Sequence, residues 1–130
     1  MEPATYFKYD GIWSDGPSII IGDKTFIGSA CEFNISKGIV VGNDVLIASG
    51  CKFIDHDHGS ATGELIRTQN SIKKAIHIED DVWLGFNVTV LKGVTIGKGA
   101  IVAAGSVVTK TILPNEIWAG IPAKKIGSRV

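Results

Sequence analysis

The sequence contains few of the features that identify several common classes of protein. It has one methionine, four prolines and two cysteines in 130 residues, and its 13 basic residues are balanced by 13 acidic ones. No block of like charge suggests a nucleic-acid face, and no run approaches the roughly 18 apolar residues of a membrane span. The start, Met1 to Ala4, lacks the basic and apolar regions of a signal peptide. We therefore expect one cytoplasmic domain over residues 1–130, with Cys31 and Cys51 as reduced thiols.

Glycine, by contrast, is abundant. It accounts for 16 of the 130 residues, above the usual share of about 7%. Isoleucine and valine are frequent as well, and β-branched residues favour strands over helices. Glycine interrupts helices and suits tight turns. The composition therefore predicts many short strands joined by turns.

Aliphatic or aromatic residues recur every six positions along most of the chain. These positions are Ile21, Ile27 and Phe33; Val41, Ile47 and Phe53; and Ile78, Leu84, Val90, Ile96, Val102 and Val108. Four residues after many of them comes a small or β-branched residue, as at Cys31, Cys51, Val88 and Ala100. This period predicts a short strand and a turn, three of which form a triangular coil that stacks on the next. An antiparallel sandwich with glycine turns is the alternative, and it fits twelve in-register positions poorly.

The repeat is interrupted twice. Two residues are inserted near Ser36–Gly38, between Phe33 and Val41. A longer polar segment, Asp55 to His77, shows no six-residue pattern and contains all three histidines of the chain. Long loops in small domains are often functional, so we expect this segment to leave the coil and to carry the site.

Several segments resemble the hexapeptide-repeat transferases, most closely sugar O-acetyltransferases of the galactoside and maltose acetyltransferase type. They are residues 42–48, 81–85, 93–97 and 104–110, with the ending 119–124. The resemblance implies an all-β, left-handed parallel β-helix of about four to five coils, with a loop at 55–77 and a C-terminal tail at 112–130. It also implies a homotrimer with active sites between subunits, acetyl coenzyme A as cosubstrate, a small-molecule sugar acceptor and no metal.

Acetyl transfer to a hydroxyl requires a base for the hydroxyl proton and donors that stabilise the oxyanion of the tetrahedral intermediate. The resemblance places the base at His58, counting forward from Ile47-Ala48. Asp55 is close enough in sequence to orient an imidazole, as a carboxylate does in a catalytic triad. His56 is a candidate for acceptor contact. The resemblance places the oxyanion donor at the backbone N–H of Phe86.

The remaining candidates also come from the resemblance. Asn34 and Trp83 are candidates for acceptor binding, although a turn role for Asn34 and interface packing for Trp83 remain open. The basic cluster of Lys124, Lys125 and Arg129 suits the 3′-phosphoadenosine group, with a solvated tail as the alternative. The full set predicted to bind the cofactor is Gly85, Ala104, Gly105, Thr109, Lys110, Lys124, Lys125 and Arg129.

Other functions remain open at this point. A γ-type carbonic anhydrase has the same kind of helix and a zinc ion bound by three histidines. The spacing of His56 and His58, followed by a distant His77, does not match that ligand set. A non-catalytic scaffold and an N-acetyltransferase of an amino sugar are further alternatives. The sequence does not identify the acceptor.

Overall fold

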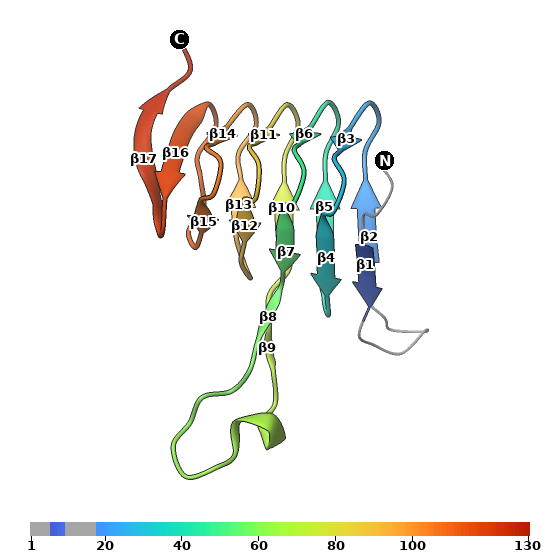
Figure 1. The fold of residues 1–130 in the computed structure, drawn as a ribbon, viewed down its shortest axis with the longest axis vertical. Coiled ribbons are helices and arrows are strands. Elements are labelled where there is room, and N and C mark those ends of the chain that lie inside the picture. Colours follow the sequence, from blue (N-terminus) through green and yellow to red (C-terminus); the bar gives the residue numbers. More distant parts are fainter. Residues whose placement is uncertain (1–5, 10–17) are drawn as a thin grey trace.

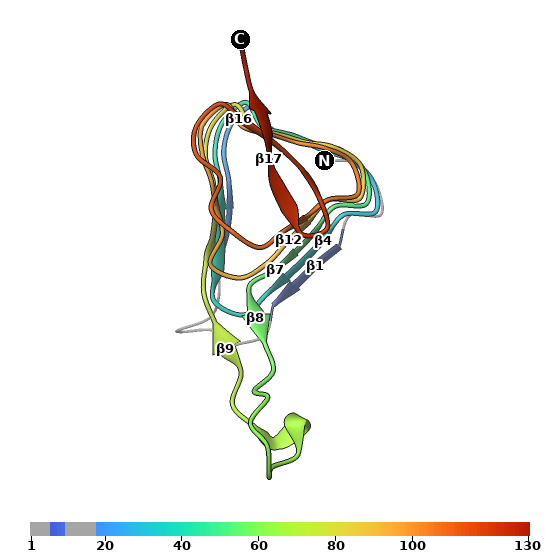
Figure 2. The ribbon, with the colours of Figure 1, turned by 90° about the vertical axis from the view of Figure 1, so that its left-hand side faces the viewer.

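The chain winds into a left-handed parallel β-helix of about five coils (Figure 1). The computed structural model describes residues 6–9 and 18–130. Seen along its axis, the helix has a triangular outline from which one hairpin projects (Figure 2). The predicted fold class is therefore confirmed.

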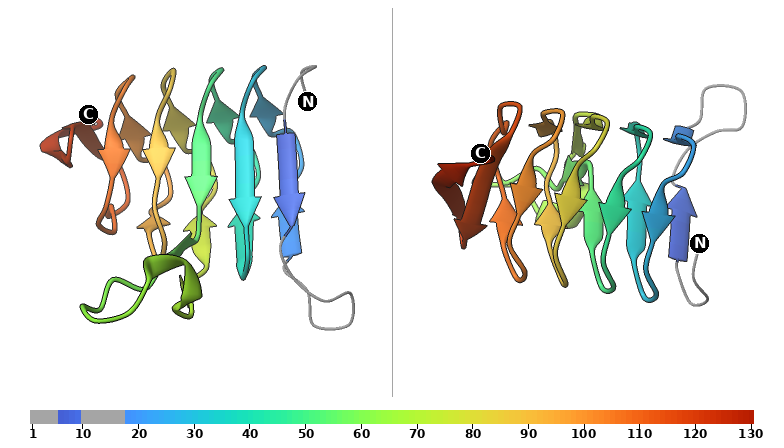
Figure 3. Two further views of the ribbon diagram at one scale, coloured as in Figure 1. Left: turned by 60° about the horizontal axis from the view of Figure 1, so that its bottom comes forward. Right: turned by 90° about the horizontal axis from the view of Figure 1, so that it is seen from above.

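Three sheets form the walls of the triangle (Figure 3). The first wall contains β1 (Tyr6–Tyr9), β4 (Glu32–Ile35), β7 (Lys52–Ile54), β12 (Thr89–Val90) and β15 (Val107–Val108). The second wall contains β2 (Ser18–Ile21), β5 (Gly38–Val41), β10 (Ile76–Ile78) and β13 (Thr95–Ile96). The third wall contains β3 (Phe26–Ile27), β6 (Leu46–Ile47), β11 (Trp83–Leu84), β14 (Ile101–Val102), β16 (Glu116–Gly120) and β17 (Ala123–Ser128).

The six-residue pattern forms the core. All of its members from Ile27 to Val108 are buried, because each points to the axis of the helix. Phe33 and Phe53 stack in successive coils with ring centroids 4.6 Å apart. Cys31 and Cys51 are buried one above the other at the same place in adjacent coils, as their spacing predicts.

Most turns between walls use residues that tolerate a left-handed backbone, with Lys24 and Ala30 as exceptions in the first coil. The last residue of the turn has positive φ at Asp44, Asp81 and Asn87, as it does at Gly99 and Gly105. Asparagine, aspartate and glycine adopt this conformation at the least steric cost. Repetition of one turn type keeps successive coils in register.

The predicted loop is a hairpin in the structure. β8 (His56–Asp57) pairs with β9 (Ile72–Lys73) in antiparallel register, and the 3₁₀ helix η1 (Ile66–Thr68) lies near its tip (Figure 1). Asp55 is fully buried where the hairpin leaves the helix, and His77 belongs to β10 of the second wall. The excursion therefore spans 56–75, and three residues expected in it, Asp55, Ile76 and His77, are part of the coil.

The predicted C-terminal tail is more regular than expected. Ile112 forms a parallel bridge with Ile96, and β16 continues the third wall, so this part completes the fifth coil. Only β17 folds back, antiparallel to β16. Across residues 6–9 and 18–130, no helix is long and apolar enough to cross a membrane.

Candidate active site

The hairpin is attached to the helix by the buried carboxylate of Asp55. The backbone N–H groups of Ser36, Lys37 and Gly38 donate to it at 2.8, 2.7 and 2.8 Å. These donors form the turn between the first and second walls in the preceding coil. The two-residue insertion near Ser36–Gly38 therefore forms a turn whose N–H groups bind an anion.

The same carboxylate contacts an imidazole. Nδ1 of His56 lies 3.1 Å from Oδ1 of Asp55, the oxygen that also accepts from Ser36. The side chain of His56 keeps 19% of its surface exposed. The structure thus brings the predicted orienting carboxylate to His56, the neighbouring residue, and this arrangement anchors one ring nitrogen while leaving the ring reachable.

His58 lies two residues further along the hairpin and is exposed. No hydrogen bond or ion pair is found for its ring within the described residues. Asp55 ties the outgoing strand to the preceding coil, and Asp57 ties it to the next coil, because Lys92 Nζ of that coil lies 2.8 Å from Asp57 Oδ2. The returning strand is held as well, since the N–H of Lys74 donates to the carbonyl of Asp55 at 2.9 Å. His58 therefore projects from a root that is fixed to the coils on both sides.

Two effects act on the pKa of Asp55. Burial raises the pKa of this carboxyl. The hydrogen bonds from Ser36, Gly38, His56 and Lys37 lower it and outweigh burial, so the pKa lies below its usual range. The group is ionised at neutral pH and can only accept hydrogen bonds.

Three other predicted residues share the first wall or its hairpin corner. Asn34 is half-buried on β4 and pairs in register with Ile54, one residue before Asp55. Thr109 and Lys110 are exposed just after β15, at the same corner two coils further on. The structure therefore places part of the predicted cofactor site along the edge from which the hairpin projects.

A second group of predicted residues lies at a different corner, between the third and first walls. The N–H of Gly105 donates to the carbonyl of Phe86 at 2.8 Å, and both residues are exposed. A side chain on Gly85 would meet the backbone nitrogen of Ala104 at 2.7 Å, so glycine is required there for the coils to stack. The N–H of Phe86 has no acceptor within the described part of the chain. Within one chain, the predicted base and the predicted oxyanion donor thus lie at opposite ends of the first wall.

Trp83 belongs to an apolar strip on the outside of the third wall. Its in-register neighbours in successive coils are Phe26, Leu46, Ile101 and Ile117. Phe26, Leu46 and Trp83 are 46%, 52% and 52% exposed. We call these five residues the apolar strip.

The basic cluster predicted at the C-terminus is divided by ion pairs. Lys125 Nζ lies 3.0 Å from Glu116 Oε2, and Arg129 donates to Asp81 Oδ2 at 3.0 Å. The hydrogen bond from Lys125 is the main reason why the pKa of Glu116 is lowered. Lys124 is exposed and makes no such pair among the described residues. Of the three, Lys124 is the cation most available to a phosphate.

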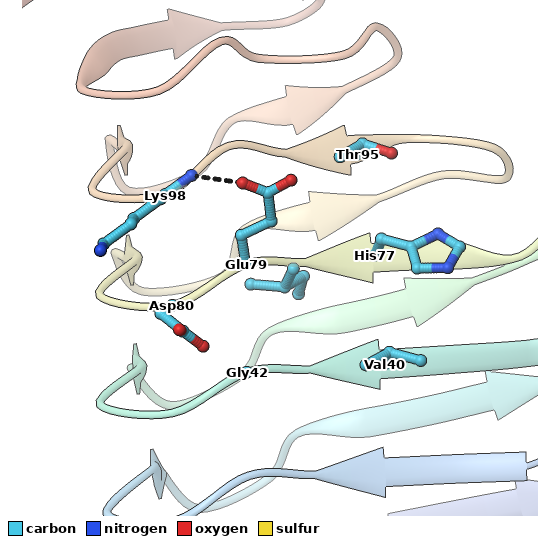
Figure 4. A pocket seen from close by; sticks show the side chains of 8 residues that line it. Val40, Gly42, His77, Glu79, Asp80, Thr95 and Lys98 are labelled. Atoms are coloured by element: carbon cyan, nitrogen blue, oxygen red, sulfur yellow. Dashed lines mark hydrogen bonds between the residues drawn. The ribbon is translucent and has the colours of Figure 1, made fainter.

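A hollow of about 500 Å³ lies on the outside of the second wall (Figure 4). His77, Glu79 and Lys98 line it, and Glu79 accepts a hydrogen bond from the N–H of Lys98 at 2.9 Å. None of the predicted catalytic residues lines it. His77 lies on β10 and His56 and His58 at the hairpin, and no group of three metal-ligating side chains converges within residues 6–9 and 18–130.

The sequence reasoning missed two contributors to this site. One is the turn Ser36–Gly38, which binds Asp55, and the other is Lys92, which contacts Asp57. The insertion after Phe33 signalled the turn but not its partner. No sequence signal distinguished Lys92 from the other lysines.

The chain is similar in sequence and in fold to known hexapeptide-repeat proteins. The bacterial transferase hexapeptide family (six repeats) matches residues 75–110, and the hexapeptide repeat of succinyl-transferase matches residues 18–51. A crystal structure of a hexapeptide-repeat-containing acetyltransferase from Vibrio cholerae is 34% identical, has a TM-score of 0.84, and aligns over 97% of this chain and 68% of its own. A structure of that protein complexed with acetyl coenzyme A has a TM-score of 0.86.

Two curated relatives have named acceptors. Galactoside O-acetyltransferase of Escherichia coli is 32% identical over 97% of this chain and 59% of its own length. A probable macrolide acetyltransferase of Lysinibacillus sphaericus is 54% identical over 84% of this chain and 62% of its own. The chain thus spans about three fifths of the length of these two relatives.

The triangular parallel β-helix and its six-residue repeats place the protein in the class of hexapeptide-repeat proteins. The chain belongs to the hexapeptide-repeat acetyltransferase family.

Proposed function

We propose that the protein is an acetyl-coenzyme-A-dependent O-acetyltransferase that acts on a sugar or sugar-containing acceptor. The observation that carries the proposal is the hairpin root, where a buried carboxylate anchors a segment with two imidazoles. Family membership supplies the donor, because a relative has been crystallised with acetyl coenzyme A. The free thiols Cys31 and Cys51 suit the cytoplasm as the compartment.

In this proposal His58 is the general base. Its imidazole takes the proton of the acceptor hydroxyl while the hydroxyl oxygen bonds to the carbonyl carbon of the thioester. The N–H of Phe86 donates to the oxyanion of the tetrahedral intermediate. When the carbon–sulfur bond breaks, the imidazolium returns the proton to the departing thiolate. Exposure of His58 and the absence of an acceptor for the Phe86 N–H in the described residues support these roles.

The complete site requires a second copy of the chain. His58 and Phe86 lie at different corners of the triangle, so one copy supplies the hairpin and its neighbour supplies the corner with Phe86, Ala104 and Gly105. The apolar strip around Trp83 and the exposed Leu65 and Ile66 near the hairpin tip offer surface for such contact. We propose a homotrimer, in which each interface is the same and the ring closes.

Coenzyme A would lie along the C-terminal coils. Gly105 has an open surface, since a side chain added there would meet nothing within 4 Å. Ala104 beside it is exposed, and so are Thr109 and Lys110. Lys124 is the proposed contact for the 3′-phosphate, because Lys125 and Arg129 already pair with carboxylates.

A macrolide is the second candidate acceptor. It is favoured by the 54% identity to the probable macrolide acetyltransferase. A macrolide hydroxyl undergoes the same reaction as a sugar hydroxyl, so the proposed roles of His58 and Phe86 are unchanged. The two candidates differ in the size of the acceptor that the cleft between copies must hold.

The test is an acceptor panel at saturating acetyl coenzyme A, with release of free thiol as the signal. The panel contains methyl galactosides and glucosides, their amino-sugar counterparts and a macrolide. Transfer to hydroxyl sugars, with the product identified as an ester by mass spectrometry, is the expected result. Transfer only to amino groups, or no transfer with intact cofactor binding, would overturn the proposal.

A further inference from the structure

We propose that His56 binds the acceptor through Nε2, and that Asp55 is the positioning residue that determines which ring nitrogen faces the acceptor. This inference rests on the proposed acetyltransferase function and deepens it. It assigns separate tasks to the two imidazoles of the hairpin, with His58 as the base and His56 as the group that selects and orients a hydroxyl.

The first step of the argument is the hydrogen-bond chemistry of the pair. An ionised carboxylate only accepts, so the contact of 3.1 Å between Asp55 Oδ1 and His56 Nδ1 requires a proton on Nδ1. In the neutral ring the lone pair is then on Nε2. His56 therefore offers an acceptor atom at the far side of its ring from Asp55.

The second step is the rigidity of Asp55. It is fully buried, and its remaining hydrogen bonds come from three consecutive backbone N–H groups of another coil. Rotation of the carboxylate would break these hydrogen bonds, two of which are buried, and leave their donors without a partner. Asp55 thus holds both the tautomer and the orientation of His56.

The third step is the location. Only Asp57 separates His56 from His58, and Asp57 is tied to Lys92 of the next coil. The exposed part of the His56 ring is therefore available to a molecule bound at the same hairpin root. A polyol can donate one hydroxyl to His56 while another faces His58.

This arrangement makes a specificity prediction. The Nε2 lone pair can accept a hydrogen bond from a hydroxyl of the acceptor. It forms no hydrogen bond with an acceptor that carries a hydrogen atom or an ether in place of that hydroxyl. A site built to hydrogen-bond a hydroxyl discriminates strongly against analogues that lack it. Acceptors with two neighbouring hydroxyls should thus be preferred over their monodeoxy forms.

The experiment uses two substitutions that imitate different halves of the ring. In His56→Asn the amide nitrogen reaches the place of Nδ1, so it keeps the contact with Asp55 but has no Nε2. In His56→Gln the amide reaches the place of Nε2. The backbone hydrogen bonds of Asp55 do not involve His56, so both variants should fold. Melting temperature and acetyl coenzyme A affinity are measured to check this.

Steady-state kinetics are measured with the best sugar of the acceptor panel. Methyl β-galactoside is measured alongside it as the reference acceptor. We expect His56→Asn to raise the acceptor KM about tenfold, the effect of one lost hydrogen bond, with a smaller change in kcat. His56→Gln should recover part of the loss. A wild-type acceptor KM in His56→Asn would show that the ring has only a structural role. A loss of kcat alone would indicate that His56 takes part in proton transfer. Either result would overturn the proposal.

Nitrogen-15 NMR of the imidazoles tests the tautomer without any acceptor. The proposal requires the neutral ring of His56 to carry its proton on Nδ1, and a proton on Nε2 would overturn it. If the tautomer is as expected but wild-type protein acetylates no panel acceptor, the acetyltransferase function has failed, and the acceptor role of His56 fails with it. Acetyltransferase activity together with a proton on Nε2 of His56, in contrast, would overturn the role of His56 and leave the proposed function intact.

Discussion

The carboxylate of Asp55 accepts a hydrogen bond from the backbone N–H of Ser36, 19 residues earlier in the chain, at 2.8 Å. This bond joins the start of the hairpin to the turn of the preceding coil. The hairpin that carries His56 and His58 is thereby part of the rigid helix at its root, although its tip projects into solvent (Figure 2).

Replacement of Asp55 by alanine should reduce the free energy of unfolding by about 3 kcal/mol or more, because three backbone N–H groups, two of them in buried hydrogen bonds, lose a charged acceptor. Denaturant unfolding measures the change. Asp57→Asn is the matched control: its ion pair with Lys92 is more than half exposed on the aspartate side, so the loss should stay below about 1 kcal/mol. Equal losses in the two variants would contradict the anchoring role.

Acid should destabilise the protein through the same group. The pKa of Asp55 is lower in the folded than in the unfolded chain, so its ionised form stabilises the fold above the unfolded value of 3.8. That contribution decreases as pH falls below about 4 and is lost once pH passes the folded pKa. Melting temperatures between pH 7 and pH 2 should fall less steeply for Asp55→Asn, which starts lower. Parallel curves would refute the assignment.

Substitution of His58 by alanine should lower kcat by roughly a hundredfold or more, as loss of a general base commonly does. Affinity for acetyl coenzyme A and the melting temperature should be retained, because the exposed ring makes no hydrogen bond or ion pair among the described residues. His77→Ala on the second wall is the control and should keep the wild-type rate. If His58→Ala remained active while His56→Ala did not, the base would be His56, two residues earlier.

Charge reversal at Lys124, Lys125 and Arg129 together should weaken acetyl coenzyme A binding, more at low salt than at high salt. The structure separates the contributions. Lys124→Glu should raise the half-saturating concentration, whereas Lys125→Glu should lower the melting temperature, because it places a like charge beside Glu116. Titration and thermal melts of the single variants distinguish the two effects. An unchanged half-saturating concentration of acetyl coenzyme A in Lys124→Glu would mean that Lys124 faces solvent and does not contact the cofactor.

Trp83→Asp should convert the proposed trimer to smaller species, because a charge in the apolar strip opposes its burial between copies. Sedimentation at micromolar concentration measures the mass. Thr89→Asp is the control, because it adds the same charge on the first wall, outside the apolar strip. It should leave the mass unchanged. A wild-type monomer would contradict the assembly and leave His58 and Phe86 apart.

The sequence alone determined the walls and core of the helix. In a parallel coil, a side chain at a given place always points the same way, so the six-residue period from Ile78 to Val108 specifies the buried positions. The same logic predicted that Cys31 and Cys51 would stack. It also showed that the chain leaves the coil after Phe53, because the period stops there.

Only the tertiary structure decided how the site is put together. The partners of Asp55 are backbone groups in another coil, and a backbone N–H has no signature in a sequence. Spacing also did not show which imidazole the carboxylate would contact, or that the coil resumes before His77, because both depend on how the chain packs. The separation of His58 from Phe86 by the width of one wall depends on the triangular cross-section, so it appears only when the chain is folded.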